Sequence, residues 1–205
     1  MEPYTPQCGD LGFTGSPGAK LSRAISYYET GKNELPAVAT HEFIVCRGKN
    51  VVEAGAGKGA NTTIRPWKER VWECSDKGSH IIVFRPPLTF IQQEVIQETA
   101  VKLNGTRYAF GEIILQAIDG RLRKLGWLKE GVPWAAKLGR LLPGTMICSG
   151  VANTCLCNAQ VLPDRFRYLT PDCTFDEAVA RRWPVVYMNE DGVEYWRQGT
   201  KERTK

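Results

Sequence analysis

Short runs of apolar residues divide much of the chain into candidate strands. The segments 41–46 (HEFIVC) and 50–55 (NVVEAG) are rich in β-branched and aromatic residues and are separated by a polar turn. The run HIIVFRPP, 80–87, is stopped by two prolines, which is typical of the end of a buried strand. An apolar stretch bracketed by glycines, 9–15, predicts a further strand, and WPVVYM, 183–188, predicts another.

A helical period, with apolar residues three and four positions apart, covers most of the remaining chain. It predicts helices at 19–30, within 64–73 after a turn, and at 89–103, 112–125, 144–159 and 174–182. The segment 126–143 carries two tryptophans and two prolines and follows neither period. We expect it to form a long irregular connection or a flap.

The order of these elements predicts the fold class. Strands precede helices without strict βαβ alternation, which indicates an α+β protein with an antiparallel sheet. The 205 residues are enough for one domain with a substantial core, and the 42% hydrophobic and 24% charged residues are ordinary for a globular protein. We expect a single domain over 1–205, with a core at about 9–187 and a frayed polar tail at 188–205.

The predicted helix at 144–159 carries the first candidate for chemistry, Cys148. Thr145 is the expected N-cap behind the Pro143–Gly144 turn, so Cys148 falls in the first helical turn. There the helix dipole and unpaired backbone N–H groups favour thiolate over thiol. The alternative is that Cys148 is a small apolar residue on the core-facing stripe of the helix.

A thiol nucleophile needs a base, and the chain has only two histidines. His41 opens one strand, and Glu53 lies twelve residues later in the next. If the connecting loop has an odd number of residues, the two side chains share a face and can hydrogen-bond; a two-residue turn would separate them. The alternative is a strand-capping His41 and a solvated edge carboxylate at Glu53. The competing base is His80. No carboxylate near it in the sequence has the spacing that would put both side chains on one face of a sheet.

Charge, hydropathy and cysteine content indicate which partners and which cellular compartment to expect. The net charge is +5, but the 27 basic and 22 acidic residues are interspersed, so we expect no nucleic-acid partner. No apolar run has the length of a membrane-spanning helix, and the N-terminus lacks the apolar core of a signal peptide. Seven cysteines, an odd number, then indicate thiols in a soluble protein of the cytoplasm or another reducing compartment.

Two further motifs do not meet the requirements of a phosphate or metal site. The glycine-rich loop GAGKGAN, 55–61, resembles a phosphate loop but has Gly59 where the pattern requires Ser or Thr. Cys155 and Cys157 are two apart on a predicted helix and point in different directions, so they cannot bind one metal ion together. A zinc site that uses Cys173 or His80 is a minor alternative. We expect neither a metal nor a cofactor.

The chain resembles the circularly permuted NlpC-type papain-fold hydrolases, and within them the YiiX-like proteins; lecithin:retinol acyltransferase-like enzymes are more distant relatives. The resemblance rests on short motifs that occur in the same order over residues 9–160: GDLGF, THEFIV, VVEAG, HIIVFRPP, NGTRYAFG and MICSGVANT. Asp10 and Tyr108 lie in these motifs, but no chemistry is assigned to them beyond a turn and an aromatic at the rim of the core.

The resemblance implies a papain-like fold in which the histidine strand precedes the cysteine helix and the antiparallel sheet packs against that helix. By the same resemblance Cys148 is the nucleophile, His41 the general base and Glu53 the orienting residue. The acyltransferase relatives often have a second histidine where this chain has Glu53, which makes them poor guides to the substrate.

The implied activity is thiol-dependent hydrolysis of an amide or ester through an acyl-enzyme. The expected partner is a small-molecule, peptide or lipid-like substrate, either a cell-wall peptide or a lipid-like acyl compound. The alternative is a catalytically silent module of the same fold, with a structural or binding role in a larger assembly and with Cys148 only contributing to packing.

Overall fold

The computed structural model describes residues 4–15, 39–55, 60–109, 145–189, 191–193 and 196. Its main feature is a six-stranded sheet of order β4-β3-β2-β1-β5-β8, in which all neighbouring strands are antiparallel. The strands are β1 (Leu11–Gly15), β2 (His41–Cys46), β3 (Asn50–Ala54), β4 (Thr62–Pro66), β5 (His80–Phe84) and β8 (Val185–Met188). The α+β class with an antiparallel sheet is therefore confirmed.

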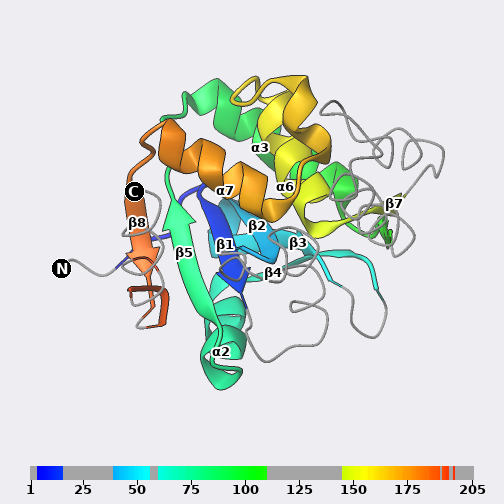
Figure 1. Ribbon diagram of the computed structural model, residues 1–205. Coiled ribbons are helices and arrows are strands. Elements are labelled where there is room, and N and C mark those ends of the chain that lie inside the picture. The colour runs from blue at the N-terminus through cyan, green and yellow to red at the C-terminus, as the bar shows by residue number, and fades with distance from the viewer. Residues whose placement is uncertain are drawn as a thin grey trace, which may run out of the picture.

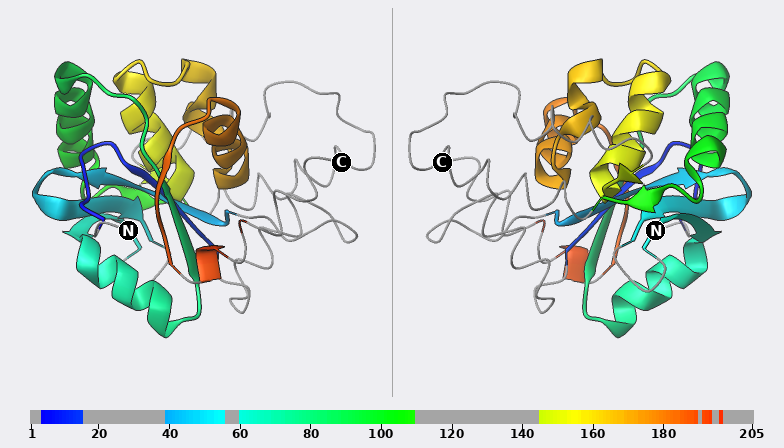
Figure 2. Two further views of the ribbon diagram at one scale, coloured as in Figure 1. Left: turned by 90° about the vertical axis from the view of Figure 1, so that its left-hand side faces the viewer. Right: turned by 90° about the vertical axis from the view of Figure 1, so that its right-hand side faces the viewer.

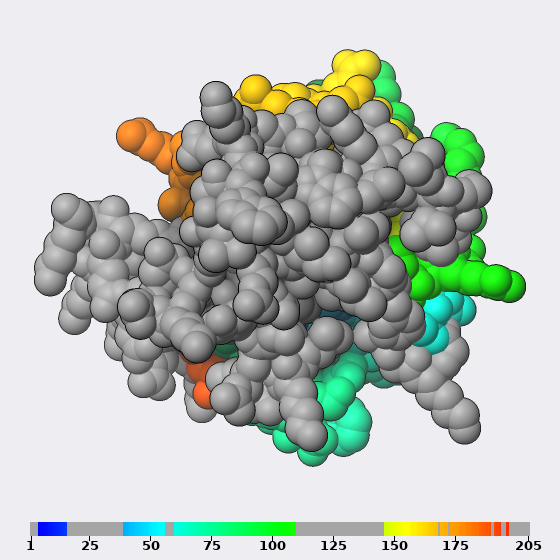
Figure 3. All heavy atoms as spheres, turned by 45° about the vertical axis from the view of Figure 1, so that its right-hand side comes forward, coloured from blue at the N-terminus to red at the C-terminus, as the bar shows by residue number. Residues whose placement is uncertain are grey.

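Helices cover both faces of this sheet (Figures 1 and 2). On one face lie α3 (Phe90–Leu103), α6 (Cys148–Asn158) and α7 (Pro171–Ala180), and on the other lies α2 (Trp67–Asp76). The space-filling view shows the same separation, with α2 on one side of the molecule and α7 and the chain that follows α6 on the other (Figure 3). Two short strands, β6 (Arg107–Tyr108) and β7 (Thr145–Met146), pair in parallel, and two 3-10 turns lie at Arg47–Lys49 and Asp164–Tyr168.

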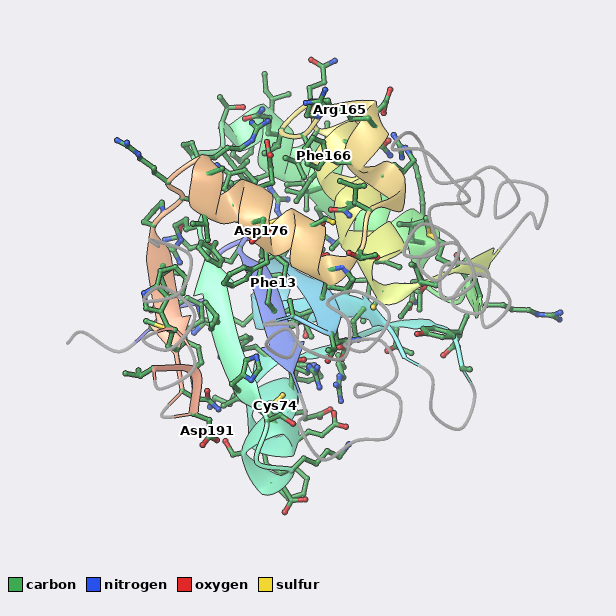
Figure 4. All side chains as sticks on the ribbon, viewed as in Figure 1. Phe13, Cys74, Arg165, Phe166, Asp176 and Asp191 are labelled. Atoms are coloured by element: carbon green, nitrogen blue, oxygen red, sulfur yellow. The ribbon has the colours of Figure 1, made fainter. Side chains whose placement is uncertain are left out.

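The alternation of side chains along the strands builds two apolar layers. Ile44 and Val52 face α6 and belong to the larger layer, in which Phe13 of β1 contacts Phe175 of α7 with ring centroids 5.3 Å apart (Figure 4). Phe43 faces the opposite way and joins the smaller layer beneath α2. Helix α6 is buried along nearly its whole length and contributes several side chains to the larger layer.

Gly12 is required by the close approach of a neighbouring ring. It lies directly opposite Phe43 in the pairing of β1 with β2, and the Phe43 ring extends across the place that a side chain would occupy. A Cβ atom built on Gly12 would lie 1.9 Å from the nearest atom of that ring. The ring is fixed in turn by Trp67 of α2, whose centroid is 5.9 Å away.

Several element boundaries differ from those predicted. A turn was expected at the start of 64–73, but residues 62–66 form strand β4 because their backbone pairs with β3 along its whole length. Helix α7 begins at Pro171 rather than at 174, since Thr170 is its N-cap and proline is favoured in the first turn. The strand predicted to extend to 87 ends at Phe84.

Other predictions concern residues that the structure does not describe. The helices at 19–30 and 112–125, the connection at 126–143 and most of the glycine-rich loop lie outside the described residues. In the predicted tail, residues 191–193 and 196 are helical, and the Trp196 ring lies 5.9 Å from that of Phe84. None of the described helices combines the length and the apolar character needed to cross a membrane.

Gly12→Ala is expected to destabilise the protein, because the new methyl group must displace the Phe43 ring from a close-packed layer. Overpacking of this kind costs about 1–3 kcal/mol in the free energy of unfolding, which denaturant titration measures. Gly55→Ala is the matched control, since a Cβ atom there meets nothing within 4 Å. Equal stability of the two variants would contradict this view of the β1–β2 packing.

Candidate active site

Cys148 is the first residue of α6, and this helix begins two residues later than an N-cap at Thr145 would place it. The prediction of that N-cap was wrong because Thr145 and Met146 are extended and pair with β6 as strand β7. The actual N-cap is Ile147, which has an extended backbone and no side-chain oxygen to bind the first N–H groups. Cys148 therefore lies at the positive end of the helix dipole with no capping side chain beside it.

Two backbone groups and one side chain surround the Cys148 sulfur. The N–H groups of Glu42 and Ser149 donate hydrogen bonds to it, and His41 is hydrogen-bonded to it from the side. Burial alone would raise the pKa of the Cys148 thiol. The charge of His41 and these three hydrogen bonds outweigh burial and lower the pKa.

His41 and Glu53 meet across the β2–β3 hairpin. The loop between these strands is Arg47–Lys49, with three residues, so the odd-loop condition for a shared face is met. The register pairs Ile44 with Val52, which places Glu53 diagonally across from His41. Their side chains touch, with His41 Nε2 2.5 Å from Glu53 Oε2. Because Nε2 is engaged with the carboxylate, Nδ1 is the ring nitrogen left for the sulfur.

The imidazole is thus held between a thiol and a carboxylate. Burial would lower the pKa of His41, but the charge of Cys148 and the hydrogen bonds to Cys148 and Glu53 raise it to about 9. A lowered thiol pKa and a raised imidazole pKa together favour a thiolate–imidazolium pair. Since the His41 side chain is 23% exposed, it is within reach of solvent.

Glu53 is buried on an interior strand, which excludes the alternative of a solvated edge carboxylate. Two arginines approach it: Arg65 Nε donates to Oε1 at 2.5 Å, and Arg70 Nε lies 3.2 Å from Oε2. Burial would raise the pKa of Glu53, but the charge of Arg70, the contact with His41 and the charge of Arg65 hold it far below its ordinary value. Glu53 is therefore ionised at neutral pH, where His41 is charged.

Sequence reasoning missed both arginines. Arg65 belongs to β4, which was not predicted as a strand, so its position beside Glu53 could not be deduced. Once β4 is known, register is a sufficient signal: Glu53 pairs with Thr63, and Arg65 is the next residue on the same face. Arg70 reaches Glu53 from α2, and only tertiary packing determines that contact.

Glu42, the residue after His41, is a second buried carboxyl group. Its side chain is fully buried, on the face of β2 that α6 covers. Burial, the largest cause, and the charge of Cys148 raise its pKa well above the ordinary value. The physical expectation is that Glu42 is protonated next to the candidate nucleophile.

The other sequence candidates have different surroundings. His80 is buried at the start of β5, and β1 separates that strand from β2. Asp10 accepts hydrogen bonds from Tyr4 and Arg85 and so ties the first residues to the end of β5. Tyr108 is buried in β6 beside the β7 strand.

The cysteines give no sign of a metal centre. All seven lie within the described residues and are thiols rather than disulfides. Within the described part of the chain, no group of three or more His, Cys, Asp or Glu side chains is placed to hold a metal ion.

Comparison with known proteins gives little beyond this geometry. No family model and no curated protein matches the chain. One crystal structure similar to it is that of YiiX from Escherichia coli O157:H7, described as a metalloprotein. The two are 16% identical, the match covers 90% of this chain and 88% of that chain, and the TM-score is 0.48. Similarity at this level assigns no function to any residue of this chain.

Alkylation of Cys148 by iodoacetamide at about pH 6 is expected to slow strongly in a His41→Ala variant. Thiols with an ordinary pKa of about 8.5 are almost fully protonated at that pH, so reaction requires the thiolate that His41 stabilises. Mass spectrometry of the labelled peptide measures the rate, in a Cys173→Ser background because Cys173 is exposed. An unchanged rate for Cys148 would show that His41 does not activate it.

Glu42→Gln is expected to stabilise the protein increasingly as the pH rises. A folded-state pKa above the unfolded value of about 4.3 means that stability is lost above that value, where the unfolded state ionises freely. Glutamine removes this penalty, so the difference in unfolding free energy between variant and wild type should grow from about pH 5 to pH 8. Glu98→Gln on the exposed face of α3 is the control. A constant difference across this range would contradict a protonated Glu42.

Proposed function

We propose that this protein is a cysteine hydrolase that cleaves an amide or ester bond. Cys148 is the nucleophile, His41 the general acid and base, and Glu53 the residue that orients His41. The observation that carries the proposal is the placement of one imidazole in hydrogen-bonding contact with both a helix N-terminal thiol and a buried carboxylate. That combination activates a thiol and provides for the proton transfers that acyl chemistry needs.

The arrangement of the elements supports a papain-like fold in circularly permuted order. In such a fold a central helix that begins with the nucleophile packs against an antiparallel sheet that carries the base. Here α6 packs against β2 and β3, and His41 and Glu53 precede Cys148 in the chain, the reverse of the order in papain. Three of the sequence motifs that resemble the permuted NlpC-type hydrolases, THEFIV, VVEAG and MICSGVANT, lie on these same elements.

The reaction proceeds in two halves. The Cys148 thiolate attacks the carbonyl carbon and forms a C–S bond, while the carbonyl electrons move to oxygen. As the intermediate collapses, protonated His41 gives its proton to the leaving nitrogen or oxygen, which departs and leaves a thioester. Neutral His41 then takes a proton from water, the resulting hydroxide attacks the thioester, and the acid product leaves as the thiolate is restored.

The oxyanion of each tetrahedral intermediate requires hydrogen-bond donors. The N–H of Cys148 lies at the uncapped start of α6, where the helix dipole also favours negative charge. Because Ser149 N–H is directed to the sulfur, the N–H of Cys148 itself is the best donor in this turn. The substrate class is an amide or ester of a cell-wall peptide or a lipid-like acyl compound.

Incubation with a mixed panel of amides and esters is expected to yield an acyl adduct on Cys148, detected by intact-protein and peptide mass spectrometry. His41→Ala should reduce the rate of adduct formation by about 10²- to 10⁴-fold, the usual contribution of general acid–base catalysis. Glu53→Gln should cause a smaller loss, since it changes how His41 is held, and Cys148→Ala should form no adduct.

A catalytically silent module would give the opposite pattern. No member of the panel would acylate the protein, and Cys148 would react with iodoacetamide no faster with His41 present than without it. That joint result would refute the proposal.

A further inference from the structure

We propose that Arg65 and Arg70 are positioning residues that fix the orienting carboxylate of Glu53, and that the reactivity of Cys148 therefore depends on them. The inference rests on the proposed function, because it concerns how the Cys148–His41 pair is supported. Neither arginine contacts the reacting atoms; both act through Glu53.

The two oxygens of Glu53 have separate partners. Oε2 faces His41 Nε2 at 2.5 Å, whereas Oε1 accepts from Arg65 Nε and is also contacted by Arg65 Nη2. A guanidinium fork that holds one oxygen from two nitrogens leaves the carboxylate little freedom to rotate. The other oxygen is thereby kept directed at the imidazole.

Arg70 contacts Glu53 on the same face of the sheet, the face that α2 covers. It extends from α2, where its guanidinium lies 5.7 Å from the centroid of the Phe43 ring. Its Nη2 donates to Thr14 Oγ1 at 2.9 Å, and Thr14 lies directly opposite His41 in the β1–β2 pairing. Since Arg70 also approaches Glu53, it links the residues that flank His41 on the two neighbouring strands.

Glu73 joins the two arginines to each other. Its Oε2 lies 2.6 Å from Arg65 Nη1 and 3.5 Å from Arg70 Nη1, and its other oxygen pairs with Lys77 at the surface. The arginines are thus fixed at both ends, by Glu53 at the sheet and by Glu73 on α2. A preformed support of this kind keeps the His41–Glu53 contact in place before substrate arrives.

Loss of the Arg65 guanidinium acts on the thiol through Glu53. The carboxylate is released to rotate, which weakens its support of the imidazolium. A less stable imidazolium raises the pKa of Cys148. Alkylation in the acid range should therefore slow, and the pH at which the rate reaches half its maximum should move upward.

The test is the pH dependence of iodoacetamide alkylation at Cys148 in the full chain. Arg65→Gln and Arg70→Gln are each expected to move the pH of half-maximal alkylation upward by about one unit, which slows the reaction about tenfold on the acid side of the profile. Arg65→Lys keeps the charge but loses the fork, and should recover part of the rate. In a Glu53→Gln background, Arg65→Gln should have no further effect, since the residue through which it acts is gone.

Arg85→Gln is the matched control. Arg85 is exposed to nearly the same extent as Arg65, at 29% against 28%, and pairs with a buried carboxylate, Asp10, in a different part of the sheet. This variant should lose stability without any shift in the alkylation profile. If Arg70→Gln fails to fold, the variants of the more exposed Arg65, Arg65→Gln and Arg65→Lys, still test the positioning role.

The outcomes separate the two proposals. If Arg65→Gln leaves the profile unmoved while His41→Ala still slows Cys148, the positioning role is refuted and the hydrolase proposal stands. Additive effects of Arg65→Gln and Glu53→Gln would also refute it, because they indicate a general structural role. If His41→Ala itself has no effect, both proposals fail.

Discussion

The contact between His41 and Glu53 is the interaction on which the rest of the site depends. It exists because the β2–β3 loop has three residues, which puts the two side chains on one face of the sheet. A change of one residue in that loop would send Glu53 to the opposite face, toward the apolar layer under α6. The carboxylate would then lose His41 and its arginines together, and the His41 ring would lose the group that contacts its Nε2.

The position of His41 at the very start of β2 matters as much as its face. His41 and Glu53 share the α2 side of the sheet with Phe43, whereas α6 covers the other side. At the end of a strand an imidazole can reach the first residue of α6 around the edge of the apolar layer. The same strand continues with Glu42 on the opposite side, so β2 presents both the His41 imidazole and a buried carboxyl group to Cys148.

The strands that carry His41 and Glu53 could be predicted from the sequence, because their residue types follow a clear local pattern. The β-branched runs around His41 and Glu53 fix two strands, and a count of loop residues then determines whether they meet. The start of α6 could not be predicted, since Thr145 has a good N-cap side chain, but pairing with β6 holds it extended. Arg65 and Arg70 could not be found either, because one depends on an unrecognised strand and the other on how α2 packs. Sequence shows which residues share an element, and tertiary structure decides which of them support the site.

An NMR titration of the His41 imidazole decides whether His41 and Cys148 form an ion pair. The chain has only two histidines, so the signals are readily assigned with one substitution. We expect His41 to be charged at neutral pH and to titrate at about 9, and Cys148→Ala to lower this pKa. Titration of His41 near the ordinary value of about 6.5, unchanged by Cys148→Ala, would show that no such pair forms.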